Sequence, residues 1–272
     1  MTLELGDYCK FYETIETEKK LFPTLPVYAR LDGINFSKFT KNCKKPFDYR
    51  LSATMIGLTE FLVKRFNASC GYTQSDEISL GWGRNREIPF NRKIQKLTSS
   101  MAGLASSYFE KNQNRINIEQ LPSFDCRVFA LPTEEDIAKQ FLWRERDCTK
   151  NAITMAAQQL YSHKELLNKK SNDKQEMMFQ KGTNFNDYPA FFKRGTFVIR
   201  RTVEEVLSEE ILNKIPVDKR PEGNTRFKRN VISTMNLPSF GSIINKCEVL
   251  LYGQEPMLYG NENNETTTSP FS

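Results

Sequence analysis

Histidine is nearly absent from this sequence, which has a single one, His163, among 272 residues. The six cysteines are scattered and include no Cys-x-x-Cys pair: Cys9, Cys43, Cys70, Cys126, Cys148 and Cys247. A structural zinc site needs about four Cys or His ligands at close spacing, so the sequence predicts that there is none. We expect mostly buried, reduced thiols, as in a reducing compartment.

Long apolar runs are also missing, and none approaches the roughly 18 residues that a membrane-spanning helix needs. The N-terminal stretch MTLELGDYCKFYETIETEKK contains acids and lacks the apolar centre of a secretory signal. It also differs from a transit peptide, which is basic and poor in acids. We therefore expect a soluble intracellular protein without a membrane partner, located in the cytoplasm or, as the alternative, in the mitochondrion.

Charge of either sign is moderate, since 39 Lys and Arg against 33 Asp and Glu give a net charge of +6 and a pI near 8.9. This excess permits a polyanionic partner such as a nucleic acid but does not require one. The hydrophobic content of 39% is sufficient for a core. The length fits one large domain or a compact domain with an added lobe.

The first half of the chain predicts alternating strands and helices. Apolar residues from Leu51 to Phe66 recur at helical spacing, for example. In chain order we expect a helix at 5–20, a strand at 26–31, a helix at 48–68, strands at 70–74 and 78–82 joined by a hairpin at 75–77, a helix at 91–111 and a strand at 125–131. This β-α-β-β-α-β order predicts an α/β (α+β) fold of the ferredoxin-like type. Both RNA-binding modules and nucleotidyltransferase palm domains use that fold, so it does not choose between binder and enzyme.

The second half is mainly helical. Thr133–Asp136 resembles a capping box and Ser162–Glu165 has its full form, so each begins a helix, and a third helix over 169–180 ends before Gly182. Residues 194–201 (RGTFVIRR) predict a late strand. We therefore divide the chain into a palm-like catalytic domain with an N-terminal helix at 1–132, a mostly helical lobe with a late strand at 133–258, and a disordered tail at 259–272.

Two acidic segments should meet at one end of the predicted sheet. In the ferredoxin-like order the first and third strands are antiparallel neighbours, so Asp32 at the end of the first lies beside Asp76-Glu77 at the start of the third. Each segment alone is typical of a plain turn. Together their like charges call for a cation, and carboxylate and backbone oxygens suit Mg²⁺. Two such ions are the arrangement used by polymerases.

The residues around these acids are suited to phosphate. Backbone amides after Gly33, over 34–37, could cradle a triphosphate. Lys45, Arg92 and Lys96 could supply cations, although each alone is typical of a solvated surface charge.

Five segments follow in an order that resembles the tRNA(His) guanylyltransferase family of 3′–5′ nucleotide-adding polymerases. They are RLDGINFSKF (30–39), YTQSDEISL (72–80), FDCRVFALP (124–132), LWRERDC (142–148) and KRGTFVI (193–199). The resemblance extends over about residues 5–205. It implies a palm-fold enzyme, a tRNA guanylyltransferase-like nucleotidyltransferase, with tRNA as its partner and ATP and GTP as substrates. Members are typically homotetramers, built as dimers of dimers.

The resemblance also implies a mechanism and a set of site residues. ATP adenylylates a 5′-monophosphate end, or a triphosphate end is used directly, and the 3′-hydroxyl of an incoming nucleotide, usually GTP, then attacks it. Asp32, Asp76 and Glu77 would be catalytic, with two Mg²⁺ on Asp32, Asp76 and the Gly33 carbonyl. The implied nucleotide-binding residues are Asp32, Gly33, Ile34, Asn35, Phe36, Ser37, Lys45, Asp48, Ser75, Asp76, Arg92 and Lys96. For tRNA we expect contacts from Arg30, Arg144, Arg146, Asn151, Lys193 and Arg194.

One segment departs from the family pattern. Members dedicated to tRNA(His) have His-Ile-Asn-Asn after the WRxxDC motif, where this chain has Thr149-Lys150-Asn151-Ala152. The loss of that His resembles the guanylyltransferase-like branch, which adds templated nucleotides to truncated tRNAs in repair or editing. The alternatives are a dedicated tRNA(His) enzyme that adds G at position −1, a non-catalytic RNA-binding paralogue, and a palm-domain nucleotide cyclase.

Overall fold

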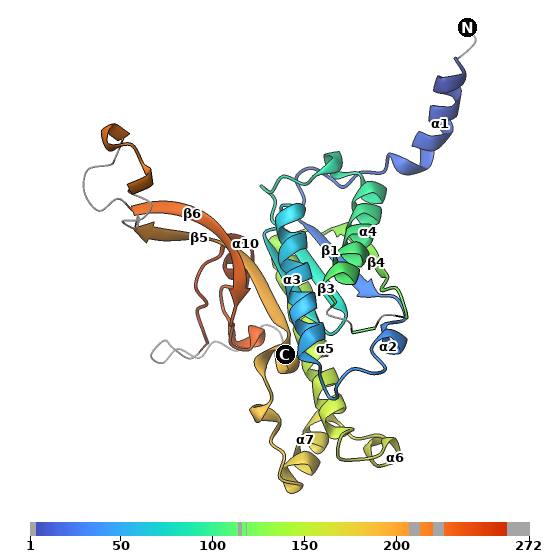
Figure 1. The fold of residues 1–272 in the computed structure, drawn as a ribbon, viewed down its shortest axis with the longest axis vertical. Coiled ribbons are helices and arrows are strands. Elements are labelled where there is room, and N and C mark those ends of the chain that lie inside the picture. Colours follow the sequence, from blue (N-terminus) through green and yellow to red (C-terminus); the bar gives the residue numbers. More distant parts are fainter. Residues whose placement is uncertain (1–3, 114–115, 118, 207–212, 220–225, 260–272) are drawn as a thin grey trace.

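The computed structural model describes residues 4–113, 116–117, 119–206, 213–219 and 226–259. Its centre is an antiparallel sheet with the order β4-β1-β3-β2-β5-β6 (Figure 1). The strands are β1 (Val27–Gly33), β2 (Cys70–Gln74), β3 (Glu77–Trp82), β4 (Phe124–Ala130), β5 (Thr196–Val206) and β6 (Arg226–Met235). The first four have the ferredoxin-like order, so the predicted topology and fold class are confirmed.

Helices pack on both faces of this sheet. The helices of the chain are α1 (Leu5–Thr17), α2 (Phe36–Phe39), α3 (Tyr49–Arg65), α4 (Ile94–Asn112), α5 (Glu134–Ala157), α6 (His163–Leu166), α7 (Ser171–Gln180), α8 (Ala190–Arg194) and α10 (Lys246–Tyr252). Apolar residues of α3 and α4 pack on one face of the sheet, and those of α5 and α10 pack on the other. A third cluster joins the C-terminal half of α5 to α7 and α8, forming the lobe at the bottom of Figure 1. Among the described helices, none is long and apolar enough to cross a membrane.

The first strand is longer than the predicted 26–31, because β1 continues through Asp32 and Gly33. Asp32 and Gly33 are paired with β4, and the chain turns only at Ile34 and Asn35, where Asn35 is left-handed (φ 57°). Asn adopts that conformation more readily than most residues. The hairpin between β2 and β3 is likewise shorter than predicted, since Glu77 already pairs with Gln74.

The helix predicted at 91–111 begins later, at Ile94. Phe90, Asn91 and Arg92 all have positive φ (58°, 52° and 60°), which a right-handed helix cannot accommodate. The N-terminal helix is also shorter than predicted and ends at Thr17, because Lys20 forms a β-bridge with Lys93. Both capping boxes, at Thr133 and Ser162, are confirmed.

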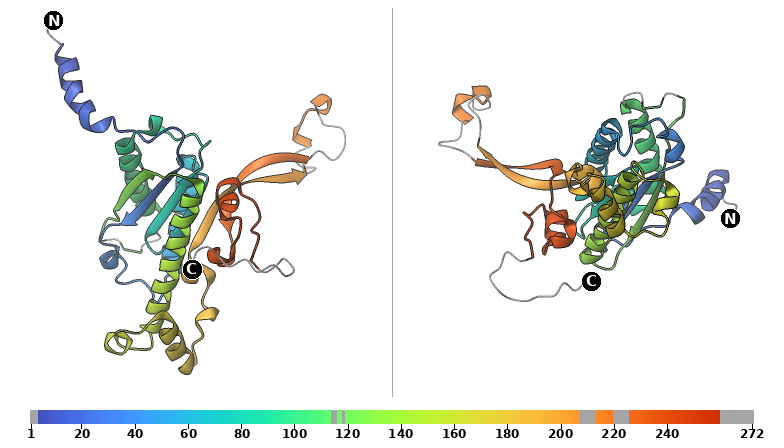
Figure 2. Two further views of the ribbon diagram at one scale, coloured as in Figure 1. Left: turned by 180° about the vertical axis from the view of Figure 1, so that it is seen from behind. Right: turned by 90° about the horizontal axis from the view of Figure 1, so that it is seen from below.

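The late strand extends the central sheet, since β5 pairs with β2 as well as with β6. It begins at Thr196 rather than at 194 and is longer than predicted. Strand β6 and helix α10 are not among the elements that the sequence predicts. The outer parts of β5 and β6 form a two-stranded arm that extends away from the helices (Figures 1 and 2). Of the predicted tail, residues 260–272 lie outside the described residues.

Candidate active site

The first and third strands bring the predicted acids together. Asp32 is paired directly with Glu77 on β3, and Asp76 occupies the turn just before it. A Cβ built on Gly33 would lie 2.9 Å from Oδ2 of Asp76, so the Asp76 carboxylate reaches the backbone of β1. Asp125 on β4 is the partner of Asp32 on its other side. Sequence reasoning missed this third acid, although its place at the start of the strand that neighbours β1 was the available signal.

The carboxylates of Asp32 and Asp76 are not neutralised by an ion pair among the described residues. Burial raises the pKa of Asp76, and the nearby charge of Asp32 raises it further, while hydrogen bonds from its own N–H and from Ser75 act in the opposite direction. Within the part of the chain that the structure describes, neither Asp32 nor Asp76 forms an ion pair. A cation at this point would relieve the repulsion.

The oxygen donors of Asp32, Asp76 and Gly33 suit Mg²⁺ that also binds water and substrate, rather than a metal ion coordinated by protein alone. In the described ranges, no group of three or more His, Cys, Asp or Glu side chains is placed to hold a metal ion. Mg²⁺ usually keeps several waters and binds through one or two carboxylates together with substrate phosphates. Asp32, Asp76 and the Gly33 carbonyl provide such a partial set of hard oxygen donors.

Glu77 has a different environment, because its carboxylate faces a buried arginine. Nε of Arg144 on α5 donates to Oε1 of Glu77 (2.6 Å), and Nη2 donates to Oδ2 of Asp147 (2.8 Å). Asn151 also donates to Asp147 (3.2 Å), which extends the polar chain along α5. Burial raises the pKa of Glu77, and the charge of Arg144 opposes that shift. The structure therefore places Arg144 and Asn151, both expected to contact tRNA, in a hydrogen-bonded network beside the acids.

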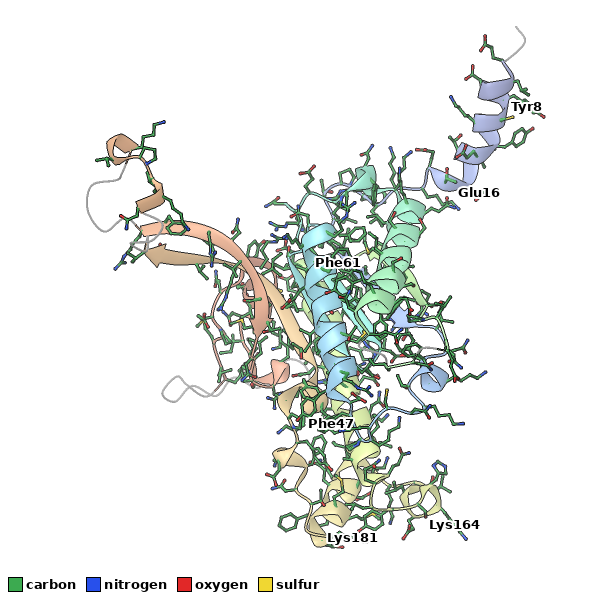
Figure 3. The ribbon with its side chains drawn as sticks, in the orientation of Figure 1. Tyr8, Glu16, Phe47, Phe61, Lys164 and Lys181 are labelled. Carbon is green, nitrogen blue, oxygen red and sulfur yellow. The ribbon has the colours of Figure 1, made fainter. Side chains whose placement is uncertain are left out.

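A cavity of about 440 Å³ opens beside these residues. Its polar lining comes from the acids, from the segment before α3 with Lys44 and Lys45, and from polar side chains of α5. Apolar side chains are added by Phe47, α5 and α8. Phe47 marks its position at the lower end of α3, next to the α5–α8 lobe (Figure 3). Positive charge, aromatic rings and unpaired carboxylates thus meet in one cavity, as in a nucleotide site.

Asp48 lines this cavity with its carboxylate already occupied. It accepts hydrogen bonds from Arg50 at backbone N (2.9 Å), Nε (3.1 Å) and Nη2 (2.8 Å), and from the Lys44 N–H (3.2 Å). The Arg50 guanidinium holds the pKa of Asp48 well below its usual range. Asp48 is therefore placed to fix the loop before α3 and to begin that helix.

The loop at 34–37 is anchored by Phe36, which is buried among Phe39, Phe109 and Phe124. Ile34 is 49% exposed, and its N–H donates to the Ser123 carbonyl (2.8 Å). The loop lies next to Asp32 in the chain but does not line the cavity, whereas Ser75 does.

Two residues expected to bind phosphate, Arg92 and Lys96, do not lie beside the carboxylates in the fold. Arg92 donates to the carbonyls of Phe22 and Leu25, which precede β1, so it is at the opposite end of that strand from Asp32. Lys96 lies over the Phe90 ring (5.5 Å) in the same region. The fold of a single chain does not bring either residue to the carboxylates.

The remaining residues expected to contact tRNA are spread around α5. Arg30 points toward the ring of Trp143, and Nζ of Lys193 is bonded to the Asn186 carbonyl. Arg194 lines a second cavity, of about 320 Å³, together with the buried Glu145. Arg146 interacts electrostatically with Glu145 and Lys246.

Known proteins resemble the chain over this whole region. A family model described as tRNAHis guanylyltransferase matches residues 6–132. A tRNA(His) guanylyltransferase from Debaryomyces hansenii is 31% identical over 211 residues, which cover 70% of this chain and 79% of that protein.

Solved structures agree with these sequence matches. A bacterial tRNA(His) guanylyltransferase (Thg1)-like protein in complex with ATP has a TM-score of 0.68 and 33% identity, covering 72% of this chain and 88% of the other. A bacterial protein of the same description in complex with GTP has a TM-score of 0.61 and 31% identity, covering 72% of this chain and 86% of the other. The chain therefore belongs to the tRNA(His) guanylyltransferase family of nucleotidyltransferases.

Proposed function

We propose that this enzyme adds nucleotides in the 3′–5′ direction to the 5′ end of truncated tRNA, after activating that end with ATP. The observation that carries the proposal is the pair Asp32 and Asp76, which form no ion pair with the described residues and line a cavity with Lys44 and Lys45. Support also comes from the related bacterial proteins, whose structures contain ATP or GTP.

In this proposal Asp32, Asp76 and the Gly33 carbonyl hold two Mg²⁺. When bound, the ions would neutralise phosphate charge and favour ionisation of the attacking 3′-hydroxyl. The protein itself orients the reactants. Phe47 and the α5–α8 side chains provide an apolar surface for a base, and the two lysines lie where phosphate oxygens would need positive charge.

Repair is favoured over dedicated addition to tRNA(His) by the segment after the WRxxDC motif. Thr149 replaces the family His, and its hydroxyl is used within the fold, donating to the Lys193 carbonyl (2.9 Å). Asn151, which is retained, lines the cavity and donates a hydrogen bond to Asp147. Templated pairing would then select the incoming nucleotide in place of a dedicated protein contact.

Assembly into a homotetramer is part of the same proposal. Helix α1 stands away from the rest of the chain and has no buried residue (Figure 1). Its exposed Leu5, Tyr8, Tyr12 and Ile15 follow heptad spacing, which suits packing against a second copy. Tyr12→Glu should lower the mass measured by light scattering, whereas an unchanged mass would exclude α1 from the interface.

The function is tested with tRNAs that lack their first nucleotide, each with one of the four template bases. We expect addition of the complementary nucleotide in each case and none by Asp32→Ala or Asp76→Ala. Asp187→Ala, an exposed aspartate between α7 and α8, is the matched control and should remain active. Addition of G regardless of template would support the dedicated tRNA(His) role instead. Normal rates in either acid variant would contradict the assignment of the metal site.

A further inference from the structure

The outer face of the sheet next to the acids is not covered by α5. Strand alternation places Asp125, Arg127 and Phe129 of β4 on the same side as α5. Yet the cluster that α5 forms with the sheet contains, among the described residues, none from β4. The Arg127 side chain is 52% exposed, and Figure 2 (left) shows β4 and β1 beside α5 on this side.

Two arginines lie directly opposite each other on this open face. Arg30 of β1 is the register partner of Arg127 of β4, and like charges in such pairs are destabilising. Arg127 donates to Asp125 (3.1 Å). Arg30 has no hydrogen bond or ion pair to the described part of the chain, and its guanidinium lies 5.8 Å from the centre of the Trp143 ring. The charge of Arg30 also acts on Glu77, so the two arginines lie at the edge of the acidic end of the sheet. An anion bound between them would relieve their mutual repulsion.

Exposed aromatic rings border the two arginines. Trp143 on α5 is 51% exposed, and Phe129, which contacts the Tyr28 ring at 5.4 Å, is 37% exposed. Burying such rings would be favourable, so their exposure beside cations indicates a binding surface. Arginine for phosphate and an aromatic ring for a base is the usual combination in proteins that bind RNA strands.

We propose that Trp143, Arg30 and Arg127 form the surface that receives the 5′-terminal nucleotides of the RNA substrate. The arginines contact its phosphates and Trp143 stacks on a base. Arg30 is two residues before Asp32 on β1, a distance of about 7 Å along the strand, so RNA held here presents its end to the carboxylates. This inference rests on the proposed function and identifies where that RNA binds.

Binding is measured with the full chain and a tRNA that lacks its first nucleotide and ends in a 5′-monophosphate. Trp143→Ala should weaken binding roughly tenfold, and Trp143→Phe should restore most of it, because stacking needs only an aromatic face. Arg127→Ala should weaken binding and lower the slope of log affinity against log salt by about one. The matched controls Phe179→Ala and Lys164→Ala, both exposed on the α6–α7 part of the lobe, should change nothing.

Fluorescence gives a readout that is independent of catalysis. The chain has two tryptophans, and Trp82 is fully buried whereas Trp143 is half exposed. Acrylamide should therefore quench Trp143 preferentially in the free protein, and saturating tRNA should protect it. In Trp143→Phe, the remaining emission should be insensitive to both acrylamide and tRNA.

The outcomes separate this inference from the proposed function. Binding of tRNA without protection of Trp143 would overturn the inference and leave the function intact, whereas no binding at all would overturn both. Equal protection by ATP or GTP alone would make the face a nucleotide site. Protection already present in the free protein would mean that a second copy covers it. Either result would also refute the proposed RNA surface.

Discussion

The buried ion pair between Glu77 and Arg144 permits a quantitative prediction. Their side chains are 9% and 7% exposed and are joined at 2.6 Å. Removing one partner of a buried pair usually costs about 3–5 kcal/mol, because the other charge remains buried without a counterion. The second contact of Arg144, to the 35% exposed Asp147, adds no more than about 1 kcal/mol. We expect Arg144→Met to lower the free energy of unfolding by about 4 kcal/mol.

The double variant determines how much of that loss belongs to the pair. Glu77→Gln removes the charge and keeps a hydrogen-bond acceptor, so we expect it to cost about 2 kcal/mol. In Glu77→Gln/Arg144→Met no buried charge is left unpaired, and the combined cost should fall at least 1 kcal/mol below the sum of the single costs. Urea unfolding followed by circular dichroism measures all four proteins. Costs that add to within about 0.5 kcal/mol would refute the coupling.

The same variants test whether Glu77 is catalytic, as the sequence predicts. If Glu77 acts on the reactants, the double variant will not add nucleotides even at temperatures where it is fully folded. Recovery of activity together with stability would show that Glu77 only positions α5 through Arg144, and would contradict its assignment as a catalytic residue.

Three further predictions concern stability. Gly33→Ala should lower the free energy of unfolding by about 1–3 kcal/mol and abolish activity, because the added Cβ would lie 2.4 Å from the buried Phe36 ring. The control Gly103→Ala, where the space is open, should raise the free energy of unfolding by about 1 kcal/mol. Burial raises the pKa of Glu145, so the folded state favours its protonated form more than the unfolded state does, and this contribution to stability is lost as pH rises. The free energy of unfolding of Glu145→Gln should therefore increase relative to that of wild type between pH 4 and 7. A difference between the two proteins that stays constant with pH would contradict this. Asp48→Ala should lower the free energy of unfolding by about 2–3 kcal/mol at pH 7, through loss of a helix cap and a charged hydrogen bond, and an intact melting temperature would contradict the role of that loop.

Local patterns in the sequence determined the order of strands and helices and, through it, the meeting of Asp32 with Asp76. The periods of apolar residues and the turn-forming residues depend on near neighbours in the chain, so they are legible without a structure. The ferredoxin-like order then fixes which strand ends adjoin. The ordered motifs identified the family, which the comparisons confirm.

Tertiary packing alone decided which charges are available. The sequence predicts that Glu77 is catalytic and that Asp48 binds nucleotide, and only the packing shows that each is held by an arginine. Arg92 read as a phosphate ligand, but three successive positive φ angles turn it toward the carbonyls before β1. Asp125 and Trp143 gained significance only from the register of β4 and the position of α5. Such partners are distant in sequence, and the burial that fixes their charge states arises only when the layers pack together.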